Sequence, residues 1–213
     1  MFTTETLDFL QDLKANNTRD WFANNKALYE THIKTAAKTF SDDLAQRLAA
    51  RYRTDVSAKI FRIHRDLRFS KDKTPYNTHV HIGFGDAATG AAWMFGLQPD
   101  DLVIGYGMFT FDKPHLTRWR EAVQGRPGDQ LINLMETARQ SGLRLSEPEL
   151  KRVPSPYPAD HRNATLLRRK SIAIWRDDLP LEHALGGDAG ADLAHAMRVF
   201  DPVRDWMIDH LPA

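Results

Sequence analysis

The chain has 213 residues, of which 42% are hydrophobic, and a formal net charge of +1. This length and composition allow a substantial buried core and argue against disorder; they are typical of one large domain or two intimately packed halves, and we predict a single domain over residues 1–213. The absence of cysteine excludes disulfides, thiolate nucleophiles and cysteine-ligated zinc or iron–sulfur sites. No stretch approaches the roughly 20 apolar residues that span a bilayer, so we expect no membrane segment and a cytoplasmic location.

Positive charge is concentrated in two segments. Residues 59–79 hold six lysines and arginines against Asp66 and Asp72, a formal charge of +4. Residues 151–170 hold six against Asp160, a formal charge of +5, and the rest of the chain therefore carries −8. This concentration favours an anionic partner bound at a local site. The alternative is that both segments are solvated faces whose cations pair with acids elsewhere.

Helical periodicity dominates the first fifty residues. Leucines spaced three apart from Leu7 to Leu13 predict one helix, and residues 16–18 are a candidate turn and helix cap. A longer helix is predicted over about residues 26–52. Its apolar face consists of Ile33, Ala37, Phe40, Leu44 and Leu48.

From Lys59 the apolar period changes to two, which is typical of strands. Phe61 and Ile63 alternate with Arg62 and His64. The same alternation recurs over residues 78–84, 91–97 and 102–110. Because short connections join antiparallel neighbours, the pattern predicts a four-stranded antiparallel meander with one face on the helices.

The second half returns to helices. We expect one helix to open at residues 112–114, and a second to open at residues 128–129 and stop at Gly142. A final helix is predicted from about Asp188, with a break or restart at residues 201–202.

Two shorter segments complete the expected fold. Residues 154–158 contain three prolines, which predicts an irregular loop, and residues 171–175 are a candidate fifth strand. The sequence thus predicts an α+β fold, in which an antiparallel meander sheet of about four to six strands packs against N-terminal and C-terminal helices.

The loop over residues 65–76 has the highest density of charged and hydroxyl side chains that can form directional hydrogen bonds. Pro75 forces Thr74 into extended geometry, so the loop should be stiff. Its guanidinium, ammonium and hydroxyl groups suit a phosphate or carboxylate. The guanidinium groups belong to Arg65 and Arg68, the ammonium groups to Lys71 and Lys73, and the hydroxyl groups to Ser70, Thr74 and Tyr76. The alternative is a structural ion-pair network in which Asp66 and Asp72 neutralise two of these cations.

His79 and His81 lie two apart on a predicted strand, so both rings would share one face and could share a metal. His64, on the preceding strand, could join them. The pair lacks a nearby acidic ligand and is incomplete, so we expect ordinary hydrogen-bonded histidines, no metal and no cofactor.

Two further clusters could contribute. Trp21 and Lys26 could line a pocket rim, although a helix cap beside a buried tryptophan explains them equally well. The second basic segment could extend the basic surface toward nucleic acid, with Tyr157 or Trp175 available for stacking.

Two stretches of the chain resemble the signatures of one protein family. They are Asn17-x-Arg19-x-Trp21-Phe22 with Asn25-Lys26, and the run from Arg65 to Tyr76; Leu150-Lys151-Arg152-x-Pro154 is similar to its second-half motif. The family is known as domain of unknown function 2461 and occurs in bacteria and some fungi. The resemblance implies a single α+β domain and a shared site, without an activity. It ties together the two clusters, so we hypothesise that the Trp21 region and the basic loop meet in one pocket.

The sequence therefore predicts a basic pocket for a phosphorylated or carboxylated small molecule. Its residues would be Arg65, Arg68, Ser70, Lys71 and Lys73, rimmed by Tyr76, His79, Trp21 and Lys26. In an enzyme the cations would stabilise transition-state charge, and His79 or Asp66 would be the candidate general base. The alternatives are a nucleic-acid-binding module that uses both basic segments, and a structural or partner-binding protein whose loop is held by internal ion pairs.

Overall fold

The computed structural model describes residues 1–212, which fall into two compact units. Unit 1 comprises residues 1–84, 94–104 and 178–196, and unit 2 comprises residues 85–93, 105–177 and those from 197 onward. Strands β2, β3 and β4 contribute residues to both units. A single domain over residues 1–213 stays a prediction.

The architecture is α+β, with a six-stranded antiparallel sheet in the order β1-β2-β3-β4-β6-β5. The strands are β1 (Val56–Ile60), β2 (Val80–Asp86), β3 (Ala92–Leu97), β4 (Leu102–Met108), β5 (Arg144–Leu145) and β6 (Ile172–Arg176). The predicted fold class and meander are confirmed, and β6 confirms the candidate strand at residues 171–175. The two-residue β5 was not predicted, because it is too short to show a period.

The first strand differs from its prediction. β1 ends at Ile60, whereas the alternation continues to His64. Residues 61–64 lie beyond this strand, and after Phe61 they pair with the chain that returns from the following loop. The Asn77 amide donates to the Ile63 carbonyl at 2.7 Å, and His64 forms an antiparallel bridge with Tyr76. An apolar period of two indicates an extended backbone, but it does not say which segment pairs with it.

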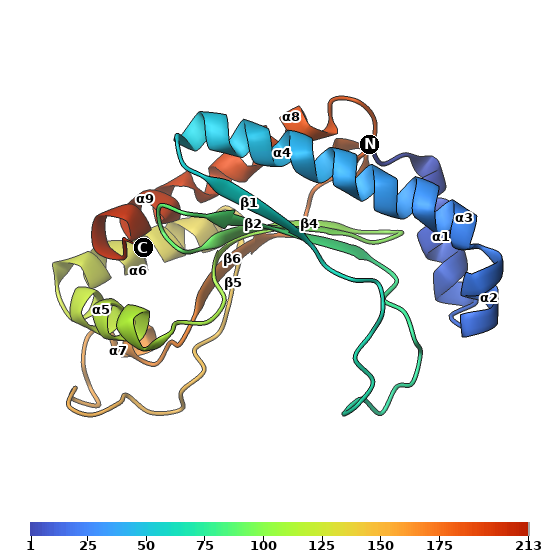
Figure 1. Cartoon of the computed structure of the whole chain (residues 1–213). Helices are drawn as coiled ribbons and strands as arrows, with labels where there is room; N and C mark the ends of the chain where they lie inside the picture. The colour runs from blue at the N-terminus through green and yellow to red at the C-terminus, as the bar shows by residue number, and fades with distance from the viewer. Residues whose placement is uncertain (213) are drawn as a thin grey trace. The chain divides into compact units, whose positions relative to one another are not determined.

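The predicted N-terminal helices are confirmed in unit 1. They are α1 (Thr4–Ala15), α2 (Arg19–Asn24), α3 (Lys26–Leu28), the π-helical segment η1 (Tyr29–Thr35) and α4 (Ala36–Tyr52). Thr18 caps the start of α2, since its hydroxyl oxygen accepts the Trp21 amide at 3.2 Å. In Figure 1, α4 runs across β1. On its buried face Phe40 packs against Phe2 and Phe95, with ring centroids 5.1 Å and 4.6 Å apart.

Helices α5 (Lys113–Val123), α6 (Arg126–Gln140) and α7 (Ala164–Leu167) belong to unit 2. α5 opens at its predicted cap, because the Asp112 carboxylate accepts the His115 amide at 2.9 Å. α6 begins two residues before the predicted Gly128, with Pro127 in its first turn. A Cβ at Gly128 would lie 2.0 Å from the Val123 carbonyl oxygen, so glycine serves there to let α6 approach the end of α5.

The C-terminal part follows the prediction closely. The 3₁₀ segment η2 (Leu181–Ala184) and α8 (Ala189–Ala196) belong to unit 1, and η3 (Met197–Phe200) and α9 (Asp201–His210) to unit 2. The predicted restart is confirmed, since α9 has Pro202 in its first turn. Residues 154–158 are irregular, as predicted. Over residues 1–212, no helix combines the length and the apolar character needed to cross a membrane.

A buried ion pair lies in the interior of unit 2. The Arg204 Nε donates to Asp86 Oδ2 at 2.8 Å, and the Tyr106 hydroxyl donates to the same oxygen at 3.0 Å. The Arg204 and Asp86 side chains are 5% and 0% exposed. Burial, together with the nearby Asp86 charge, raises the pKa of Tyr106, so the phenol stays protonated and can donate.

Replacing Arg204 by methionine should destabilise the protein strongly. The change withdraws the guanidinium from a buried carboxylate, and breaking one side of a buried ion pair costs about 3–5 kcal/mol. Urea unfolding measures the loss. Lys34→Met is the control, because it removes an exposed partner of Glu30 and should change the unfolding free energy by about 0.5 kcal/mol or less. Equal, small effects of both variants would contradict this prediction.

Candidate anion-binding site

Residues 61–79 connect β1 to β2 as a long loop that pairs with itself. Near the sheet, the Phe61 amide donates to the His81 carbonyl at 3.0 Å, and further out the Arg65 amide donates to the Pro75 carbonyl at 3.0 Å. Figure 1 shows this loop extending from the strands on the side away from α4. We call residues 61–79 the signature loop, and residues 66–73 its tip.

A cavity of about 300 Å³ lies at the base of the signature loop. It is lined by Phe61, Arg62, His64, Arg65, Asp66, Asn77, His79 and His81. All of these residues belong to unit 1. The cavity therefore combines two guanidinium groups and three imidazoles with one carboxylate and one amide.

The imidazole rings of His79 and His81 stack in this cavity, with centroids 3.9 Å apart and planes inclined by 25°. A Cβ at Gly96 on β3 would lie only 3.1 Å from Cδ2 of His81. Glycine on the neighbouring strand thus leaves the room that the His81 ring occupies.

The two rings are held in their neutral form. Burial, with a smaller contribution from the adjacent His81, lowers the pKa of His79 to about 4. Partial burial also lowers the pKa of His81. At neutral pH each ring therefore has one nitrogen that donates and one that accepts.

Arg62 and Arg65 differ in how firmly they are held. Arg65 Nη1 donates to Asp72 at 2.5 Å and to the Thr74 carbonyl at 3.1 Å, and Nη2 donates to Ser70 at 3.4 Å. Arg62, by contrast, is exposed, and its guanidinium has no hydrogen-bond or ion-pair partner within residues 1–212; only its backbone carbonyl accepts, from Asn77 Nδ2 at 3.3 Å. The bonds that Arg65 makes fix the orientation of its guanidinium in the cavity wall, whereas the Arg62 guanidinium has no bond of this kind.

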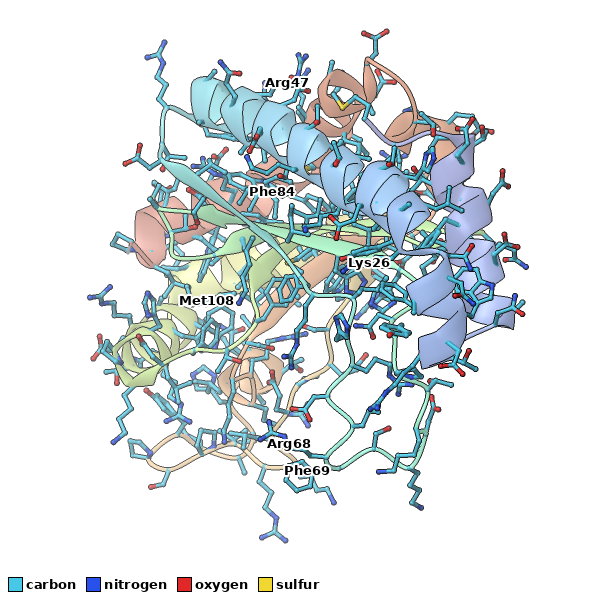
Figure 2. The ribbon with its side chains drawn as sticks, turned by 45° about the vertical axis from the view of Figure 1, so that its right-hand side comes forward. Lys26, Arg47, Arg68, Phe69, Phe84 and Met108 are labelled. Carbon is cyan, nitrogen blue, oxygen red and sulfur yellow. The ribbon has the colours of Figure 1, made fainter. Side chains whose placement is uncertain are left out.

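At the tip, two of the three predicted cations, Arg68 and Lys73, bond within the loop itself. Arg68 holds Asp66 through two bonds, Nε to Oδ1 at 2.9 Å and Nη2 to Oδ2 at 2.6 Å, which lowers the pKa of Asp66. Lys73 Nζ donates to the Leu67 carbonyl at 3.0 Å. Both loop aspartates are thus paired with arginines, as the structural alternative expects. Figure 2 shows Arg68 and Phe69 at the tip, far from Lys26.

Tyr76 anchors the signature loop to the N-terminal helices. The Asn17 side-chain amide pairs with both backbone groups of Tyr76: Nδ2 donates to the carbonyl at 2.9 Å, and Oδ1 accepts the amide at 3.1 Å. The Phe22 ring stacks on the Tyr76 ring at 4.1 Å. The two stretches that carried the family resemblance therefore meet, through Asn17, Phe22 and Tyr76.

Trp21 and Lys26 do not line the cavity at the base of the loop. The Trp21 ring packs on Phe9 with centroids 5.6 Å apart, and it lines a separate cavity of about 200 Å³ beside Glu5, Asp8 and Asp12. Adjacent residues on a helix point in different directions, so Phe22 reaches the loop and Trp21 does not.

Of the residues proposed from the sequence, Arg65, Asp66 and His79 line the cavity. Arg68, Ser70, Lys71, Lys73 and Tyr76 are in the signature loop but outside the lining. Sequence reasoning passed over Arg62 and Asn77 as site residues and considered His64 only for a metal. The alternation of the sequence could have indicated these residues. It places Arg62 and His64 on one face of the chain, opposite the buried Ile63.

Within the described part of the chain, no group of three or more histidine, cysteine, aspartate or glutamate residues is arranged to hold a metal ion.

The fold and this cavity define an α+β protein with a guanidinium- and imidazole-lined pocket at the base of a self-paired loop. The family model described as "Conserved hypothetical protein (DUF2461)" matches residues 5–206, and the chain belongs to this family. The resemblance noted from the two signatures is thereby confirmed. No curated protein matches the chain significantly.

Asn17→Ala should loosen the signature loop. It removes both hydrogen bonds to the Tyr76 backbone, and two such bonds are worth roughly 1–3 kcal/mol. Hydrogen exchange followed by mass spectrometry should show faster exchange across residues 65–77. Asn16→Ala is the matched control, because the Asn16 amide bonds only within its own helix end. The same acceleration in both variants would contradict the anchoring role of Asn17.

Stability should fall as the pH drops from about 6.5 toward 4. The folded protein keeps His79 neutral until about pH 4, whereas an unfolded histidine takes up a proton near pH 6.5. The unfolded state therefore binds more protons in this window, and the free energy of unfolding decreases with decreasing pH. Urea unfolding at several pH values should give a shallower dependence for His79→Gln. The control, His195→Gln, changes an exposed histidine on α8; a slope unchanged in His79→Gln would contradict the assignment.

Proposed function

We propose that the cavity at the base of the signature loop binds a small phosphorylated or carboxylated molecule. The observation that carries this proposal is the guanidinium of Arg62, which lines the cavity and makes no ion pair or hydrogen bond with any described residue. A planar guanidinium group without an acceptor suits two oxygens of a phosphate or carboxylate.

The other lining groups support directional recognition of a small anion. Arg65 adds a second guanidinium, which its ion pair with Asp72 holds in place, and the Asp66 charge is matched by Arg68. The neutral rings of His79 and His81 and the amide of Asn77 can donate hydrogen bonds to further ligand oxygens. A volume of about 300 Å³ lies at the lower end of small-molecule sites.

Of the two candidate general bases, His79 is the better suited. Its pKa, lowered to about 4, leaves the ring unprotonated at neutral pH, and the same low value makes it a weak base. Asp66 is committed to a two-bond pair with Arg68, and this pair weakens it as a base. The proposal itself is for binding, and a reaction on the bound molecule would depend on His79.

The nucleic-acid alternative has less support. Of the six cations in residues 151–170 on which it relies, Arg169 is only 3% exposed and Arg162 pairs with Asp129 at 3.0 Å, which leaves Lys151, Arg152 and Lys170 as the other exposed cations. Nucleic-acid binding and a cytoplasmic location both stay predictions.

A thermal-shift screen tests the proposal, with inorganic phosphate, sugar phosphates, nucleotides and dicarboxylates as ligands. A ligand at one hundred times its dissociation constant adds about 2.7 kcal/mol, which is roughly 5–10 °C for a chain of this size. The shift should disappear in Arg62→Gln. It should persist in Lys71→Gln, which removes the same charge from the tip of the loop without touching the cavity.

Three outcomes would contradict the proposal. They are no shift with any small anion, equal shifts in both variants, or a response to oligonucleotides alone. In the last case the salt dependence identifies the alternative, because neutralising about six phosphates of duplex DNA gives a log–log slope near −5.

A further inference from the structure

A second cavity, of about 190 Å³, lies in unit 2 among α6, β5 and α7. Most of its wall is apolar and consists of Ile132, Met135, Leu145 and Leu166. One charged side chain of the lining, Arg169, is almost completely buried, with 3% of its surface exposed. This combination of apolar walls and a buried guanidinium is absent from the lining of the first cavity.

The guanidinium of Arg169 is incompletely satisfied. Its Nη1 donates to Ser146 Oγ at 3.0 Å. Its Nε is buried and has no hydrogen-bond partner, and Nη2 has none among the described residues. Since Nε and Nη2 form one edge of the guanidinium, a complete two-donor edge lacks an acceptor.

Elsewhere in the same chain this edge binds carboxylates. Arg144 uses Nε and Nη2 to hold Asp177 at 2.7 and 2.8 Å, and Arg68 holds Asp66 in the same way. Arg169 therefore presents, inside unit 2, the arrangement that recognises a carboxylate, but without the carboxylate.

The charge of Arg169 is also unmatched at short range. No carboxylate of residues 1–212 forms an ion pair with it. The nearby Glu149 accepts instead from the Lys170 amide at 2.7 Å and from the Ser171 hydroxyl. Burial lowers the pKa of Arg169, against the opposing influence of Glu149 and Glu147. A buried charge without a close counter-charge is costly, and an anionic ligand would offset that cost.

The remaining polar lining does not supply the counter-charge. Glu136 lies in the lining, but its carboxylate accepts from Arg139 at 3.3 Å, and both side chains are more than half exposed. These two charges compensate each other at the surface. The net charge that a ligand meets in the cavity is that of Arg169.

We propose that this cavity binds a small apolar carboxylate, whose carboxylate oxygens accept from Nε and Nη2 of Arg169 while its hydrocarbon part contacts Ile132, Met135, Leu145 and Leu166. The volume sets the size of the ligand, because an engineered apolar cavity of about 150 Å³ holds one benzene. A six-carbon ring or chain with one carboxylate matches the space. This site and its ligand class are separate from the anion site at the base of the signature loop.

Benzoate is the probe, and benzamide is its neutral match of the same shape. Arginine side-chain NMR on the ¹⁵N-labelled protein reports directly on the Arg169 Nε–H, which is assigned by its loss in Arg169→Gln. We expect this resonance to shift saturably with benzoate and to be unmoved by benzamide. Removing the charge-assisted donors Nε and Nη2 in Arg169→Gln should weaken benzoate binding at least about tenfold.

Three further variants keep the test decisive. Thr165→Trp changes an exposed lining residue of α7, fills the cavity and should weaken binding by at least about tenfold even if Arg169→Gln fails to fold. Lys170→Gln removes the same charge from the adjacent, exposed position and should keep wild-type affinity. Arg62→Gln should also keep it, which separates this site from the first.

The proposal is overturned by an Arg169 resonance that does not move at millimolar benzoate, or that moves equally with benzamide. It is also overturned if Thr165→Trp binds benzoate as the wild type does, because binding would then lie outside the cavity.

Discussion

The pairing of Asn17 with Tyr76 is the contact on which the candidate site depends. One side-chain amide takes the place of a neighbouring strand, satisfying both the amide and the carbonyl of Tyr76, and Phe22 covers the Tyr76 ring. Next to Tyr76, the chain bonds across to Ile63 and Arg65, so the anchor fixes both limbs of the signature loop. Without it, the loop would lose the frame that brings Arg62, His64 and His79 together.

Charge in the signature loop has two separate roles. At the tip, Arg68 with Asp66 and Arg65 with Asp72 form pairs that shape the loop. At the base, the Arg62 guanidinium makes no such pair, and we propose that it binds a ligand. Part of the high charge density of residues 59–79 therefore serves the folding of the loop, and only the geometry separates these cations from the one proposed for binding. In unit 2, Arg169 shows the same division: one nitrogen bonds to Ser146, while its Nε–Nη2 edge lacks an acceptor.

Much of the fold could be predicted because its signals are local. Leucine spacing predicts α1, the Asp112 cap predicts the start of α5, and alternation predicts β2, β3 and β4. The site was predicted less well. The alternation assigns Arg62 to a strand and so does not mark it as a site residue, and the indole N–H and the family signature point to Trp21, whereas its neighbour Phe22 makes the contact with the loop. The contact between Asn17 and Tyr76 spans 59 residues, and no local pattern specifies such a partner. β5 and α7, with two and four residues, are too short for any period.

The central claim is that the base of the signature loop, and not its charged tip, binds the anion. A crystal soaked with tungstate, a heavy tetrahedral anion with strong anomalous scattering, tests this claim most directly. We expect an anomalous peak within hydrogen-bonding distance of the Arg62 guanidinium, beside His79 and Arg65. A peak confined to Lys71 and Lys73 at the tip, or no peak near the signature loop, would contradict the account.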